Sequence, residues 1–320
     1  MILTRQGAIG SKQASERGSS FFNHQIAAVA LSLVLVFNNI YIFASKHDAV
    51  TSAAAQRTPK LADGCYHVFM DVGANIGVHG RFLLEPHKYP KATLAEAFFV
   101  DLFGPNRDNR DVCVFAFEPN PAHHGRLGSL SAAYANMGWR YHVVPVGVSD
   151  EKGTLNFYRR NDVHYNEWGF SVAKPPPAES ANITVEIPVV RLAQWIEDHV
   201  EGRLLPETVH GSQQNTKKGP QVLMKLDIES MEFRVFPDLL LSGVFCRDID
   251  VIFGEVHRRT TFFPFYFSGP KESRKSFQNI KEAGNYWSSL LLAATTNPHC
   301  RGSFVEADDE IYLMDGEPFP

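Results

Sequence analysis

The chain has the composition of a folded protein without a nucleic-acid-binding face. It has 320 residues, 44% of them hydrophobic, which suffices for the core of one large domain or two small ones. The net charge of −4 and the pI of about 6.4 disfavour a nucleic-acid-binding protein, because such proteins usually carry a basic face.

The N-terminal region has the pattern of a membrane anchor. Residues 1–25 are polar and more basic than acidic, and residues 26–44 contain no charged side chain. A helix over residues 26–44 would cover most of the hydrocarbon core of a bilayer. The basic flank predicts that residues 1–25 form a cytosolic tail and that the rest of the chain lies across the membrane. A cleaved signal peptide and a buried soluble helix are the alternatives to this signal anchor.

Residues 45–62 are rich in Ser, Ala, Gln, Thr and Pro and predict a stem without a core. Residues 63–320 alternate between short β-rich runs and helical stretches, which is typical of a parallel sheet covered by helices on both faces. The expected strands are His67–Val72, Val112–Phe117, Tyr141–Val148, Val222–Asp227 and Val251–Val256.

Two helices are expected besides the crossovers of a minimal sheet. Leu94–Phe103 predicts an extra helix inside a long insertion, and Met231–Leu241 has apolar residues at spacings of three and four. Pro237 would kink or split the second of these helices, which should end at Gly243. Residues 201–219 are polar and predict a surface loop.

The four cysteines are Cys65, Cys113, Cys246 and Cys300. They lie far apart and form no C-x-x-C pair, so the usual zinc and redox motifs are absent. We expect them to be buried as small apolar side chains. Disulfides become an alternative only if the domain lies in an oxidising compartment.

The segment Val68–Gly77 reads as a strand that runs into a glycine-bearing turn. Gly73 allows a tight turn and the close approach of a ligand, while Gly77 lets the next helix pack against the sheet. Asp71, at the strand end, can bind a cationic amino group or order the loop. Asn75 replaces the middle glycine of the dinucleotide fingerprint, which disfavours a pyrophosphate and favours an aminoacyl-nucleoside cofactor.

Glu118 follows the second expected strand, within Val114–Asn120. An acidic residue at the carboxyl end of this strand is the usual acceptor for both hydroxyls of a bound ribose. Its separation from Gly77 is longer than usual, and the insertion over residues 85–111 explains the difference.

Four motifs together resemble the FkbM-type methyltransferases. They are Asp71–Gly77, Phe117–Pro119, Gly147–Asp150 and Lys225–Glu229, and the resemblance covers roughly Tyr66 to Asp315. It implies a Rossmann-like class I methyltransferase sheet, with S-adenosylmethionine held by Asp71, Gly73, Asn75, Gly77 and Glu118. It also implies O-methylation of sugar or natural-product hydroxyls, and a closing strand over Ala307–Asp315.

The sequence departs from the family pattern at two places. Glu229-Ser230 stands where the family usually has Glu-Gly, and Leu192–Trp195 lacks the Asp that the family often carries there. Both departures concern the geometry of the substrate site and leave the glycine turn intact.

The candidate catalytic residues follow the strands that should border the ligand crevice. Asp227 ends the fourth strand, Glu229 and Glu232 follow it, and Glu255 and His257 share one face at the end of the fifth. Methyl transfer to a hydroxyl needs alignment of the reacting atoms and a group that removes the hydroxyl proton. We predict Asp227, Glu229 and His257 as this catalytic set. The spacing of these three is not that of a known metal motif, so no metal site is predicted.

The anchor, the stem and the lumenal orientation resemble the layout of type II Golgi enzymes that modify glycans. The sequon Asn182-Ile183-Thr184 agrees with a lumenal domain. We therefore expect a glycan or small-molecule hydroxyl as acceptor, and no nucleic acid. The alternatives are a membrane-tethered binding protein of the same fold without catalysis and, less favoured, a nicotinamide-dependent oxidoreductase.

Overall fold

The computed structural model describes residues 57–160, 169–173, 180–211, 219–258, 279–307, 311–312 and 315–320. The chain divides into two compact units, Met1–Thr58 and Pro59–Pro320, and all described helices and strands belong to the second. The predicted cytosolic tail, transmembrane segment and most of the stem lie outside the described residues. Within the described part of the chain, none of the helices has both the length and the hydropathy that crossing a bilayer requires.

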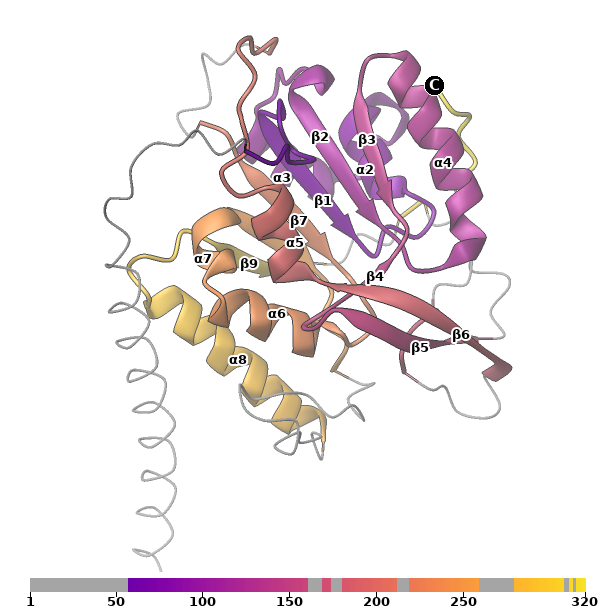
Figure 1. The fold of residues 1–320 in the computed structure, drawn as a ribbon, viewed down its shortest axis with the longest axis vertical. Helices are drawn as coiled ribbons and strands as arrows, with labels where there is room; N and C mark the ends of the chain where they lie inside the picture. Colours follow the sequence, from indigo (N-terminus) through magenta and orange to yellow (C-terminus); the bar gives the residue numbers. More distant parts are fainter. Residues whose placement is uncertain are drawn as a thin grey trace, which may run out of the picture. The chain divides into compact units, whose positions relative to one another are not determined.

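A six-stranded parallel sheet forms the centre of the second unit, in the order β3-β2-β1-β7-β8-β9 (Figure 1). Its strands are β1 (His67–Val72), β2 (Val112–Phe117), β3 (Arg140–Val144), β7 (Val222–Leu226), β8 (Val251–Gly254) and β9 (Ser303–Glu306). The strands β1, β2 and β7 are buried along their whole length, as expected for a sheet covered on both faces. The predicted α/β fold is therefore confirmed.

Helices cover both faces of this sheet. On one face, α2 (Val78–Leu84), α3 (Thr93–Phe103) and α4 (Pro121–Asn136) pack in a cluster that includes Phe69 and Val114. On the other, α5 (Leu192–His199), α6 (Glu232–Leu241), α7 (Val244–Asp248) and α8 (Ile280–Thr296) pack in a cluster that includes Met70 and Phe115. Neighbouring residues of one strand thus point into different cores, which is the two-residue period of a strand.

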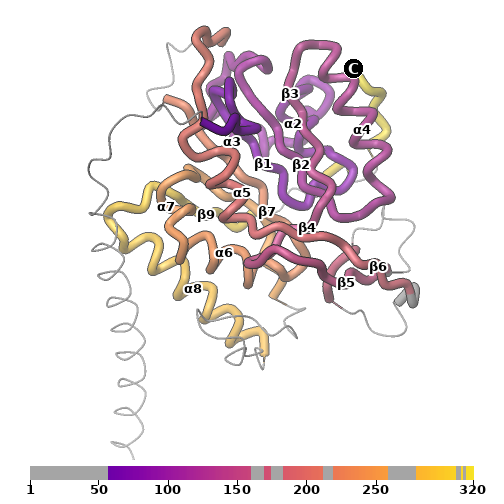
Figure 2. The backbone as a smooth tube through the Cα atoms, in the orientation of Figure 1, coloured from indigo at the N-terminus to yellow at the C-terminus, as the bar shows by residue number. Residues whose placement is uncertain are grey.

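A second sheet of three strands, in the order β4-β6-β5, was not predicted. It consists of β4 (Gly147–Ser149), β5 (Gly153–Arg160) and β6 (Ser180–Arg191), and Figure 2 follows the backbone from β3 through β4 into the antiparallel β5–β6 pair. The predicted strand Tyr141–Val148 is wrong as one element, because the chain leaves the first sheet after Val144. The alternation of apolar and polar residues over residues 183–189 was the available signal for β6.

The two extra helices appear where the sequence places them, and two short 3-10 turns (Pro86–Lys88 and Asn109–Asp111) flank α3. Of the two effects expected of Pro237, a kink or a split, the split does not occur, because α6 continues through this residue to Leu241. Gly243 ends this helix as predicted: it lies just past the C-cap in a left-handed conformation with φ 79°, donates to the Leu240 carbonyl oxygen and precedes α7. The described part of the loop over residues 201–219 contains neither helix nor strand.

The closing strand of the first sheet lies earlier than predicted. The structure has β9 at Ser303–Glu306, beside β8, whereas the described residues of the predicted segment, Ala307, Ile311, Tyr312 and Asp315, are not in a strand. The remaining residues of that segment lie outside the described ones.

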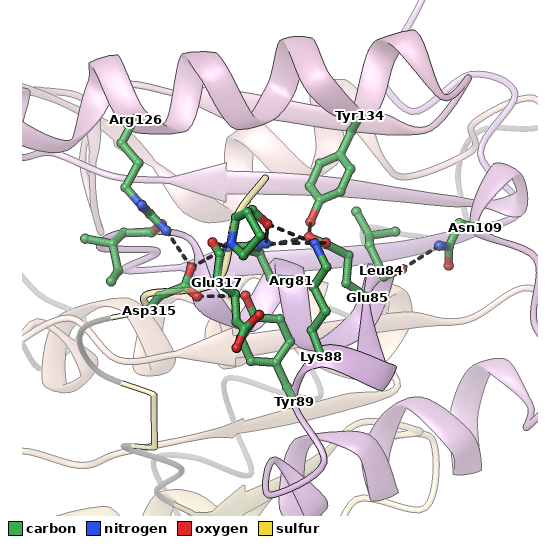
Figure 3. A network of polar contacts seen from close by, with 12 residues as sticks. Arg81, Leu84, Glu85, Lys88, Tyr89, Asn109, Arg126, Tyr134, Asp315 and Glu317 are labelled. Atoms are coloured by element: carbon green, nitrogen blue, oxygen red, sulfur yellow. Dashed lines mark hydrogen bonds and ion pairs between the residues drawn. The ribbon is translucent and has the colours of Figure 1, made fainter. Parts of the chain in front are cut away.

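A buried ionic cluster ties the C-terminal residues to α2 (Figure 3). The guanidinium of Arg81, whose side chain is 0% exposed, donates to Glu85 Oε1 at 2.9 Å, to Asp315 Oδ2 at 2.7 Å and to the carbonyl oxygen of Pro318 at 2.7 Å. The hydroxyl of Tyr89 donates to the other oxygen of Asp315 at 2.7 Å. These bonds hold the end of the chain beside the helix that follows the glycine turn.

The expectation that the cysteines are unpaired is wrong. Disulfides join Cys65 to Cys113 and Cys246 to Cys300. The pairing could not be predicted from spacing, because the partners are 48 and 54 residues apart. Cys65 meets Cys113 where β1 lies beside β2, and Cys246 of α7 meets Cys300 in the segment before β9.

Removal of either disulfide should lower stability. Each bridge closes a long loop and so restricts the unfolded chain, and we expect a loss of about 2–4 kcal/mol for a Cys→Ala pair. Urea unfolding of the Cys65→Ala/Cys113→Ala variant, compared with the oxidised wild type, measures the loss. An unchanged midpoint would show that this bridge does not contribute.

Candidate active site

The register of the sheet brings the predicted site residues to one edge. Val72 of β1 lies beside both Phe117 of β2 and Leu226 of β7, and Leu226 lies beside Gly254 of β8. The four strands therefore end at the same level. The residues that come next in the chain are Gly73, Glu118, Asp227 and Glu255, and all four line one pocket.

The glycine turn begins this pocket. Gly73 has φ 86°, and a Cβ atom there would lie 1.9 Å from the carbonyl oxygen of Asp227. Gly73 is thus required because the backbone at the end of β7 packs directly against it. A Cβ atom on Gly77 would meet Leu127 at 2.8 Å and Tyr141 at 2.9 Å, so this glycine permits the close helix packing that the sequence predicts.

The Glu118 side chain faces the backbone of Asn75 across the turn. The Asn75 backbone N–H donates to Glu118 Oε2 at 2.6 Å, and the Asn120 N–H donates to Glu118 Oε1 at 2.7 Å. Asn75 itself has φ 49°, a conformation that asparagine tolerates better than most residues. Its Oδ1 atom is buried and has no hydrogen-bond partner among the described residues.

The Glu118 carboxyl titrates near neutrality. Burial raises its pKa to about 7, although the amides of Asn120 and Asn75 and the charge of Lys225 act in the opposite direction. Each carboxylate oxygen accepts one amide hydrogen bond, which leaves capacity for one further donor on each.

Asp71 lies behind the pocket wall and does not line the pocket. Its side chain is 0% exposed, and neither carboxylate oxygen has a hydrogen-bond partner among the described residues. Burial raises the pKa of Asp71 to about 6, with Lys225 opposing and Asp227 reinforcing the shift. From this position Asp71 can affect a ligand through the loop and through the local charge.

Lys225 joins the glycine turn to the acidic end of the pocket. Its Nζ atom donates to the Gly73 carbonyl oxygen at 2.9 Å and to Asp227 Oδ2 at 2.8 Å, and its side chain is 7% exposed. Lys225 and Asp227, two residues apart at the strand end, therefore form an ion pair. Burial raises the pKa of Asp227, but Lys225 and His257 outweigh that effect and lower it below its usual range.

The predicted catalytic residues come together around His257. Its Nε2 atom lies 3.8 Å from Asp227 Oδ1, 3.9 Å from Glu229 Oε1 and 3.5 Å from Glu255 Oε2. Its Nδ1 atom lies 3.0 Å from Glu232 Oε1, which also accepts a hydrogen bond from the Ile228 N–H at 2.8 Å. Asp227, Glu229 and Glu255 line the pocket, whereas His257 and Glu232 stand behind them.

The imidazole of His257 is held as a cation by its neighbours. Burial lowers the pKa of His257, but Glu232, Glu229 and Asp227 outweigh this effect and raise the pKa to about 10. With its proton in place at neutral pH, the ring cannot remove a proton from an acceptor.

Ser230 has a backbone conformation that glycine adopts more easily than serine. This explains why the sequences that the chain resembles usually have Glu-Gly where this chain has Glu229-Ser230. It has φ 80°, and its Oγ atom donates to the His257 carbonyl oxygen at 3.1 Å. Ser230 thus has a strained backbone, and its hydroxyl forms a hydrogen bond to the loop after β8.

The Ser230→Gly variant should be more stable than Ser230→Ala by about 1 kcal/mol. Both variants lose the hydroxyl, but only glycine relieves the left-handed backbone. Thermal unfolding of the two proteins side by side tests this ranking, and the reverse order would contradict it.

Sequence reasoning missed the apolar wall of the pocket and one histidine. Phe157 of β5 and Phe170 stack at 5.2 Å between ring centroids and line the pocket with Val148. His79 of α2 also lines it, and burial together with Lys225 lowers its pKa to about 3, so the ring stays neutral. The place of His79 in the first turn after Gly77 was a usable signal, whereas the wall depends on the unpredicted second sheet.

Comparison with known proteins supports the interpretation of these motifs. No curated protein and no solved structure matches the chain. Residues 71–284, more than half of the chain, match the Methyltransferase FkbM domain, and this range includes the glycine turn, Glu118 and the carboxylates around His257. The resemblance inferred from the four motifs is confirmed, and the chain belongs to the FkbM methyltransferase family.

Proposed function

We propose that this methyltransferase uses S-adenosylmethionine to O-methylate a hydroxyl of a glycan or small metabolite. The observation that carries the proposal is the pocket itself. One end holds Glu118 between two backbone amides, and the other end holds Asp227, Glu229 and Glu255. A nucleoside site and an acidic acceptor site thus share one cavity at the carboxyl edge of a parallel sheet.

The residues of the pocket suit this cofactor. The carboxylate of Glu118 can accept hydrogen bonds from both ribose hydroxyls, and the buried Asn75 Oδ1 offers an acceptor to a further donor. The apolar wall of Val148, Phe157 and Phe170 suits a flat purine ring. When bound, S-adenosylmethionine supplies an electrophilic methyl group on a sulfonium.

The acidic end of the pocket would bind and orient the acceptor hydroxyl. Asp227 is ionised throughout the physiological range, and its bond to Lys225 fixes one of its oxygens. Asp227 Oδ1 and the Glu229 carboxylate are then available to accept the hydroxyl hydrogen and to take the proton as the methyl group is transferred. His257 would hold these carboxylates in place.

Cofactor affinity should rise with pH through the pKa of Glu118. A carboxylate accepts ribose hydroxyls only when it is ionised, and the pKa of Glu118 is about 7. Between about pH 8 and about pH 6 the ionised fraction falls roughly tenfold, so the dissociation constant should increase by up to about tenfold. Titration calorimetry with S-adenosylmethionine at both pH values measures the change. Glu118→Gln should bind more weakly at both and show no such slope; a slope kept in this variant would contradict the assignment.

Two experiments test the proposed function as a whole. Calorimetry of the full chain with S-adenosylmethionine should give a saturable signal, and its absence would favour a non-catalytic binding protein. Incubation with a methyl-labelled donor and a set of glycans and small alcohols should then label an acceptor at oxygen. Label on nitrogen or carbon only would leave a methyltransferase but contradict O-methylation.

The two disulfides also support a location in the secretory pathway. Disulfides persist in oxidising compartments, and the basic flank before residues 26–44 favours a lumenal domain. We propose a single-pass type II protein of the Golgi or another secretory membrane. Protease protection of the C-terminal unit in intact microsomes, together with a glycan on Asn182, would agree with this topology. Digestion without detergent would contradict it.

A further inference from the structure

We infer that Asp227, Glu232 and His257 bind a divalent metal cation at the acidic end of the pocket. One potential ligand atom from each of the three residues lies within 4.8 Å of the other two. The sequence predicts no metal, because the spacing of Asp227, Glu229 and His257 matches no known metal motif. The first turn of α6 instead brings Glu232 beneath His257.

Glu232 provides the strongest evidence for a missing partner. Its side chain is 0% exposed, and its Oε1 atom contacts the Ile228 N–H and His257 Nδ1. Its other oxygen, Oε2, is buried and has no hydrogen-bond partner among the described residues. Leaving a carboxylate oxygen desolvated and unpaired is costly, and a bound ion is one partner that would satisfy it.

The distances around His257 also suit a shared cation. Two atoms each about 2.1 Å from one ion are roughly 3.0–4.2 Å apart, depending on the angle between them. The separations from His257 Nε2 to the Asp227, Glu229 and Glu255 oxygens are 3.8, 3.9 and 3.5 Å. They fall in this range, and most are too long for hydrogen bonds. Glu229 and Glu255 are therefore within reach as additional ligands.

The charge balance agrees with a cation. Four carboxylates surround His257, and a divalent cation would take the place of the proton on the imidazole nitrogen that binds it. Carboxylate oxygens together with one imidazole suit Mn²⁺ and similar divalent ions. Because three of the carboxylates line the pocket, an ion there could also hold the acceptor hydroxyl.

This inference deepens the proposed function and rests on it for its catalytic meaning. An alcohol has a far higher pKa than a carboxyl group, so a carboxylate alone is a weak base for it. A bound cation lowers the pKa of a coordinated hydroxyl and orients it.

The test measures Mn²⁺ binding to the full chain, purified in detergent and without a methyl donor, by electron paramagnetic resonance. We expect one bound Mn²⁺ per chain, with affinity reduced at least tenfold in Glu232→Gln and in His257→Gln. Glu207→Gln, which makes the same change at an exposed site, should bind like the wild type. Circular dichroism and thermal unfolding of each variant show whether it is folded.

Absence of Mn²⁺ binding by the wild type, or equal binding by folded Glu232→Gln and His257→Gln, would overturn the inference. Calorimetry with S-adenosylmethionine on the same samples separates this failure from that of the proposed function. Cofactor binding without Mn²⁺ binding would leave the methyltransferase proposal standing and remove the metal. Mn²⁺ binding lost in the two variants would support the site whether or not the cofactor binds.

Discussion

Replacement of Arg81 by methionine should lower the free energy of unfolding by about 3–5 kcal/mol. Methionine fills much of the same space but removes the positive charge between Glu85 and Asp315, whose side chains are 2% and 0% exposed. Two buried carboxylates would then lose a partner, as would the carbonyl oxygens of Glu317 and Pro318. Urea unfolding monitored by circular dichroism measures the loss.

Two further variants show whether the loss comes from the buried charges. Arg110→Met removes an exposed arginine bonded to Asp108 and should leave the unfolding midpoint near that of the wild type. Adding Asp315→Asn to Arg81→Met should recover part of the stability, because Asp315 is then a buried carboxylate that has lost one of its two arginine partners and keeps Arg126. If the double variant is less stable than Arg81→Met, the charge argument fails.

Asp227→Asn should lower turnover by about two orders of magnitude or more while changing cofactor affinity by less than about threefold. Asparagine keeps the shape of the side chain but loses the charge that binds Lys225 and faces His257. The residue lies at the acidic end of the pocket, away from the cradle around Glu118, so the acceptor step should suffer rather than cofactor binding.

Labelled methyl transfer at saturating donor gives the turnover of this variant, and calorimetry gives its cofactor affinity. Asp198→Asn, the same change at an exposed helix position, should have full activity. Wild-type turnover in Asp227→Asn, or a loss confined to cofactor affinity, would show that Asp227 is not part of the acceptor site.

Local sequence patterns predicted the centre of the fold well. The strands His67–Val72 and Val112–Phe117 appear with their predicted bounds. Each is a short, continuous apolar run that ends at a glycine or an acidic residue, which is the pattern of a buried strand. The meeting of Glu118 and Asp227 at one edge also followed, since parallel strands place their carboxyl ends together.

Features that depend on distant parts of the chain could not be predicted in the same way. The buried position of Glu232 beneath His257 requires the turn through Glu229 and Ser230, whose left-handed backbone the sequence conceals because neither is glycine. The cysteine pairs and the second sheet likewise join segments that only the folded chain brings together.

The positions of the two disulfides divide the sheet into two functional ends. Cys65 and Cys113 lie at the starts of β1 and β2, and Cys246 and Cys300 lie just before β8 and β9. Every chemical group proposed for the reaction lies at the opposite ends of the strands. The disulfides can therefore stabilise the amino ends of the strands while residues at the carboxyl ends change during evolution. Substitutions that change the methyl acceptor in a related enzyme would then not reduce the stability that the two disulfides provide.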